Sequence, residues 1–105
     1  MIKVYNKAIR DKIPEIIEAS GASCVVDVLE DEEFVDKLVL KLDEEIEEYR
    51  ESKSVEELCD LIEISYRIAE IYGVSNEELE EMREKKNRER GKFKNNLYLI
   101  QVNEK

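Results

Sequence analysis

Apolar residues between positions 31 and 51 recur every three or four residues, which is the spacing of one face of an α-helix. The residues on this face are Phe34, Leu38, Leu42, Ile46 and Tyr49. A second stripe of the same period begins after Ser54 and continues to Gly73, a residue type that often ends helices. A third, more polar helix is expected to follow Ser75. The pattern therefore predicts three helices joined by short turns.

Two Ser-x-x-Glu patterns mark the starts of the second and third helices. Ser54 precedes Glu57, and Ser75 precedes Glu78, at the spacing of a capping box. In that arrangement the serine hydroxyl and the glutamate carboxylate each accept a hydrogen bond from the other residue's backbone N–H. One further short helix is expected within residues 11–21, which contain a proline near the start and a glycine at the end.

Three other segments have the composition of β-strands. They are residues 1–6, residues 24–30 (C-V-V-D-V-L-E) and residues 96–102 (N-L-Y-L-I-Q-V). The expected fold is mainly α, an antiparallel helical bundle with a small β element formed by the chain ends and residues 24–30. At 105 residues, the chain is expected to form a single domain over residues 1–105.

The composition restricts the classes of function. Charged residues make up 42% of the chain and the formal net charge is −10, a sign that repels nucleic acid and anionic membranes. The absence of histidine excludes Ser-His-Asp catalysis and histidine-ligated zinc. With two cysteines, no signal peptide and no apolar run of membrane-spanning length, we expect a cytoplasmic protein. Because so short a chain buries a modest core, a homodimer or higher homo-oligomer is expected.

Nine acidic residues lie between positions 41 and 61. Projected at about 100° per residue, Glu45 and Glu48 lie together at the border of the first apolar face, and Glu57 and Asp60 lie at the border of the second. If the two helices pack antiparallel, the four carboxylates face one another. Their repulsion at a half-buried interface would be relieved by protonation or by a divalent cation. Oxygen-only ligands suit a hard ion such as Mg²⁺.

Purely structural explanations exist for the same acids. Glu57 occupies the glutamate position of a capping box, and Glu45 could pair with Lys41 one turn earlier. Acidic runs on helices are usually solvated faces. The projection also directs Glu44 away from the apolar face, which makes it the weakest candidate. From the pattern alone, a metal site and a solvated acidic surface both stay open.

Four motifs occur in the order of a known superfamily. Residues 44–48 (E-E-I-E-E) fit E-E-x-x-E, and residues 57–60 (E-L-C-D) fit E-x-x-D. Residues 5–17 (Y-N-K-A-I-R-D-K-I-P-E-I-I) and residues 88–93 (R-E-R-G-K-F) stand near the two ends. Together they resemble the all-α nucleoside triphosphate pyrophosphohydrolases, in particular a MazG-like branch that opens with Y-N-K-L-V-R-D-K-I-P. The eight residues between the acidic motifs are fewer than most members carry.

The resemblance implies a reaction and its machinery. Glu45, Glu48, Glu57 and Asp60 would be the catalytic residues and would bind Mg²⁺, with Mn²⁺ as the alternative ion. The substrate would be a nucleoside triphosphate, cleaved between the α and β phosphates to give a nucleoside monophosphate and pyrophosphate. Such enzymes are thought to clear non-standard nucleotides.

Basic residues gather in two segments of this acidic chain, which are the expected places for substrate phosphates. The candidate phosphate ligands are Lys7, Arg10, Lys12, Arg88 and Arg90. An alternative from another class is a non-catalytic helical interaction or oligomerisation protein that keeps the acidic pattern without activity.

Overall fold

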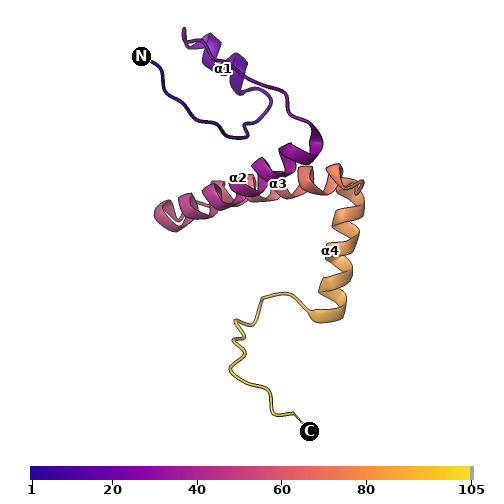
Figure 1. Ribbon diagram of the computed structural model, residues 1–105. Coiled ribbons are helices and arrows are strands. Elements are labelled where there is room, and N and C mark those ends of the chain that lie inside the picture. The colour runs from indigo at the N-terminus through magenta and orange to yellow at the C-terminus, as the bar shows by residue number, and fades with distance from the viewer. Residues whose placement is uncertain (105) are drawn as a thin grey trace.

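The computed structural model describes residues 1–104, which form four helices. They are α1 (Ile13–Ala19), α2 (Asp31–Ser52), α3 (Glu56–Ile71) and α4 (Asn76–Arg90). Figure 1 shows α2 and α3 side by side as an antiparallel hairpin, with α4 turning away from the end of α3. The prediction of a mainly α fold is confirmed. None of these helices has both the length and the apolar character that crossing a bilayer requires.

The hairpin turn is short because α2 ends abruptly. Lys53 follows the last residue of α2 in the left-handed conformation, with φ of 57°, and its N–H donates to the carbonyl oxygen of Tyr49. Such a residue reverses the chain at a helix C-terminus. The helix therefore does not continue into residues 53–55, and the acidic motifs of α2 and α3 come face to face.

Only one of the two predicted capping boxes is formed. At the start of α4, the Ser75 hydroxyl accepts from the Glu78 N–H and the Glu78 carboxylate accepts from the Ser75 N–H. The prediction of a capping box at Ser54 is wrong, because α3 begins at Glu56 and has Val55 as its N-cap residue. The Ser54 hydroxyl accepts from the Glu56 N–H at 3.3 Å instead.

The hydrophobic core is small and lies where the N-terminal segment meets the hairpin. Its buried members are Ala8, Leu38 and Ile64. The half-buried residues packed around them are Phe34, Leu42, Ile68 and Ile71. Because Ala8 precedes every helix, the segment that carries it is fixed against α2 and α3 by this contact.

The predicted small β element is not confirmed. Residues 1–6, 24–30 and 96–102 include no strand in the part of the chain that the structure describes. A strand needs a neighbour for its backbone N–H and C=O groups, and the two chain ends lie at opposite ends of the molecule (Figure 1). Residues 96–102 therefore have no strand partner in residues 1–6 of the same chain.

Candidate functional site

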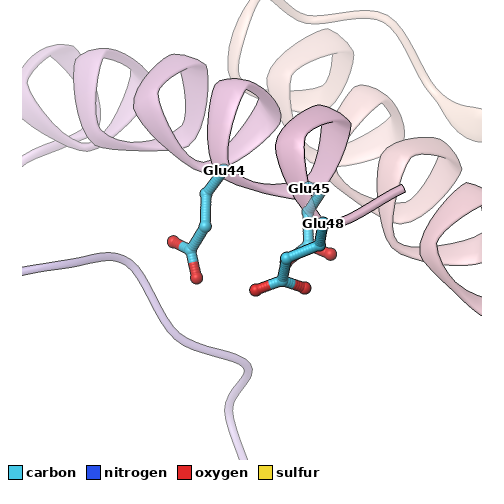
Figure 2. A group of neighbouring side chains, drawn as sticks. All are labelled: Glu44, Glu45 and Glu48. Carbon is cyan, nitrogen blue, oxygen red and sulfur yellow. The ribbon is translucent and has the colours of Figure 1, made fainter. Parts of the chain in front are cut away.

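Carboxylates of α2 and α3 gather near the turn that joins the two helices. Oxygen atoms of Glu45, Glu57 and Asp60 lie within 4.8 Å of one another, and the same holds for Glu44, Glu45 and Glu48. Figure 2 shows the last three side chains leaving the same side of α2. Glu45 belongs to both groups and joins them. The structure thus brings together the four carboxylates that the sequence singled out, and adds Glu44.

Glu45 is the centre of this carboxylate cluster. It is only 4% exposed, and its Oε2 atom is buried without a hydrogen-bond partner. The other oxygen, Oε1, lies 3.7 Å from the Nζ of Lys41. Burial raises the pKa of Glu45 to about 7, and the nearby carboxyls of Glu57, Glu48 and Asp60 add to the rise. A buried anion with an unsatisfied oxygen is a place where a cation would be strongly stabilised.

Glu48 and Glu57 connect the two helices across the cluster. A hydrogen bond to the Glu57 carboxyl is the main reason that the pKa of Glu48 is raised. Glu48 itself is exposed, whereas Glu57 is half-buried. Glu57 is available for this contact because the capping box that would have held it is not formed.

Glu44 corrects the helical projection, which directed it away from the apolar face. Its Oε1 accepts a hydrogen bond of 2.9 Å from the Lys7 Nζ, and the Nζ of Lys41 lies 3.6 Å away. The hydrogen bond from Lys7 lowers the pKa of Glu44. The projection considered α2 and α3 only, whereas the N-terminal segment covers a further side of α2. The spacing of Glu44 and Glu48, four residues apart on one face, was the available signal.

The predicted basic residues divide into two sets. Lys7 lies at the edge of the cluster, and the Arg10 Nη2 donates to the Asp60 Oδ1 at 2.6 Å. Lys12 is exposed beside this segment, at the N-cap position of α1. Arg88 and Arg90 are in the last turn of α4, which among the described helices contacts α3 and not α2. One chain therefore assembles the carboxylates with Lys7 and Arg10, but not with Arg88 or Arg90.

The donor set fits a hard divalent cation. All candidate ligand atoms are carboxylate oxygens, the type that Mg²⁺ and Mn²⁺ prefer. Lys7 and Arg10 each neutralise one rim acid, Glu44 and Asp60. They leave Glu45 Oε2 unsatisfied at the centre. The negative charge is thus paired at the rim of the cluster, whereas at its buried centre the Oε2 of Glu45 has no hydrogen-bond partner.

Comparison with known proteins gives one partial relative. An uncharacterized protein of Mycolicibacterium smegmatis is 50% identical over 42 residues, which cover 40% of this chain and 43% of the relative. No family model matches the chain. No solved structure matches it either. The chain therefore shares part of its length with an uncharacterized bacterial protein.

Proposed function

We propose that this protein is a Mg²⁺-dependent nucleoside triphosphate pyrophosphohydrolase with a MazG-like helical arrangement. The proposed reaction cleaves the bond between the α and β phosphates and releases a nucleoside monophosphate and pyrophosphate. The proposal rests on the resemblance of the four motifs and on the position of their acidic residues around a single point.

The observation that carries the proposal is the buried, unpartnered Oε2 of Glu45. An acidic surface that is merely solvated does not need a carboxylate that is only 4% exposed. Burying a charged or polar oxygen without a partner costs about 1–3 kcal/mol or more. A cation held by Glu45, Glu57 and Asp60 would remove that cost, and Glu48 would complete the set from the exposed side.

The chain's own residues would bind and orient the substrate. When bound, Mg²⁺ polarises phosphoryl oxygens and stabilises the negative charge of a leaving pyrophosphate. Arg10 and Lys7 lie at the rim of the cluster, where a phosphate chain held against the carboxylates would meet them. The planar guanidinium of Arg10 suits two phosphate oxygens at once. A carboxylate of the cluster would accept the proton of the attacking water.

One observation favours the alternative of a non-catalytic interaction protein. Two of the rim acids are already paired with basic residues of the same chain, Glu44 with Lys7 and Asp60 with Arg10. A structural ion-pair network of that kind needs no substrate. It does not account for Glu45, whose nearest cation, Lys41, remains at 3.7 Å.

The test is pyrophosphate release from a panel of standard and damaged nucleoside triphosphates with Mg²⁺. Glu45→Gln and Asp60→Asn are expected to abolish release, because each removes a negative ligand oxygen from the cluster. The matched control is Glu47→Gln, which removes the same charge from an exposed position of α2 that pairs with Arg50. It should retain wild-type release.

Metal binding is measured beside activity. Mg²⁺ that binds the folded state should raise the melting temperature of the wild type and of Glu47→Gln, and should have little effect on Glu45→Gln. Absence of release from every nucleotide, together with a melting temperature that Mg²⁺ does not change, would overturn the proposal and favour the interaction protein.

A further inference from the structure

The chain exposes far more surface than a compact protein of its size. Its accessible surface is 9,824 Å², whereas a compact monomer of this mass exposes about 6,100 Å². The radius of gyration is 18.3 Å, against about 13 Å for a compact domain of this length. The excess of roughly 3,700 Å² is more than the roughly 1,000–2,500 Å² that one chain contributes to a typical obligate interface, so the chain has ample surface for one.

Much of this surface belongs to the C-terminal arm, which we define as residues 76–104. Figure 1 shows the arm leaving the hairpin at the end of α3 and extending away from it. Its attachment to the rest of the chain is slight: α4 contacts α3 alone among the described helices, with a hydrogen bond from the Tyr66 hydroxyl to Glu80. The arm is therefore held only near its base.

The end of the arm is apolar and uncovered. Phe93 is fully exposed, and five apolar residues beyond it each expose more than two thirds of their surface. They are Leu97, Tyr98, Leu99, Ile100 and Val102. A patch of this kind on an otherwise charged protein is typical of an interaction site.

The middle of the arm is basic. Of the ten residues 85–94, six are Lys or Arg and one is Glu, in a chain whose net charge is −10. The hairpin carries the opposite excess, with nine acidic residues between positions 41 and 61. Within one chain the arm extends away from that acidic surface. A second copy offers the same acidic surface to it, while the overall negative charge repels a nucleic acid.

We propose that the C-terminal arm of one chain docks on the α2–α3 hairpin of a second copy. The basic residues 85–94 lie against the partner's acidic hairpin, and the apolar residues 97–102 cover apolar residues that the partner exposes beside it. Val25 and Val28, both almost completely exposed just before α2, are suitable acceptors. This assignment uses surface, charge and shape alone and does not depend on the proposed enzymatic activity.

The first test is the mass of the full chain in solution, measured by light scattering after size-exclusion chromatography. The wild type should have at least twice the mass of one chain. Leu97→Asp/Leu99→Asp should reduce the mass to that of one chain, and Arg88→Glu/Arg90→Glu should weaken the assembly in the same direction. The control Lys3→Glu/Lys12→Glu makes the same charge change at exposed positions outside the arm and the hairpin, and should leave the assembly intact.

A second measurement does not depend on variants that disrupt the interface. A spin label at Asn95→Cys, an exposed arm position between the basic and the apolar residues, is introduced in a chain with Cys24→Ser and Cys59→Ser and mixed with isotope-labelled wild type. Signals of α2 in the labelled copy should broaden. A monomeric wild type would overturn the proposal. The arm would then have to bind a partner other than a second copy of this chain. An oligomer that survives both arm variants, or α2 signals that do not broaden, would assign the interface to another face.

Discussion

Arg10 donates a hydrogen bond of 2.6 Å from Nη2 to the Oδ1 of Asp60, although the two residues are fifty positions apart. This contact fixes the N-terminal segment against α3 at the rim of the carboxylate cluster. Lys7 makes the equivalent contact with Glu44 of α2. Two basic side chains of the short N-terminal segment thus pair with carboxylates of a site that α2 and α3 build.

Arg10→Ala is expected to increase the affinity for Mg²⁺ by about two- to fivefold, because it removes a cation that competes for Asp60. The factor corresponds to the modest free energy of a partly exposed ion pair. Titration calorimetry with Mg²⁺ measures it directly. Arg67→Ala is the control: it removes the same charge at the far end of the hairpin, where Arg67 lies 3.7 Å from Asp31. Equal effects of the two variants would mean that only net charge matters.

The stability of the metal-free protein should fall as the pH rises from about 4.5 to about 7, because of Glu45. Its pKa is about 7 in the folded protein against 4.5 for an ordinary glutamate, so the folded state keeps a proton that the unfolded state has released. Folding is therefore favoured by this group at low pH, and that contribution is lost as the pH passes through 7. The expected size is roughly 1–3 kcal/mol.

Glu45→Gln should remove this pH dependence and, without metal, should be more stable than the wild type above neutral pH. Urea unfolding at about pH 5 and about pH 8 measures the difference. Glu47→Gln, exposed on the same helix, should keep the wild-type slope. The same slope in Glu45→Gln would contradict the assignment of the shift to this carboxyl.

Leu38→Ala should destabilise the protein by about 2–4 kcal/mol, because Leu38 is one of the three buried apolar residues that form the core in the described part of the chain. In so small a core, that loss is expected to lower the melting temperature sharply, as followed by circular dichroism. Val39→Ala, one position along α2 and about half exposed, should change it little. Similar losses in the two variants would mean that the core lies elsewhere.

Ser75→Ala should cost about 1 kcal/mol, because the Ser75 hydroxyl caps the N-terminus of α4. Ser54→Ala should cost clearly less, since Ser54 precedes the N-cap residue of α3 and forms no capping box. Denaturant unfolding of both variants under one condition compares them. A larger loss from Ser54→Ala would reverse the assignment of the two helix starts.

The local pattern of the sequence was sufficient for the helices. The apolar period that begins at Phe34 predicted α2 almost to its last residue, and Ser75 with Glu78 predicted the start of α4. It was also sufficient to place Glu45 and Glu48 on one border of α2. These features depend on residues three or four positions apart, whose geometry a helix fixes by itself.

The tertiary structure decided everything that depends on distant segments. The N-terminal segment brought Lys7 to Glu44 and Arg10 to Asp60, which no helical projection contains. The left-handed Lys53 set the turn that places Glu57 beside Glu45. The β-like composition of residues 24–30 and 96–102 did not produce strands, because a strand also needs a neighbour. The sequence by itself determined which groups are present and how each helix presents them, whereas packing determined which of them meet and how deeply Glu45 is buried.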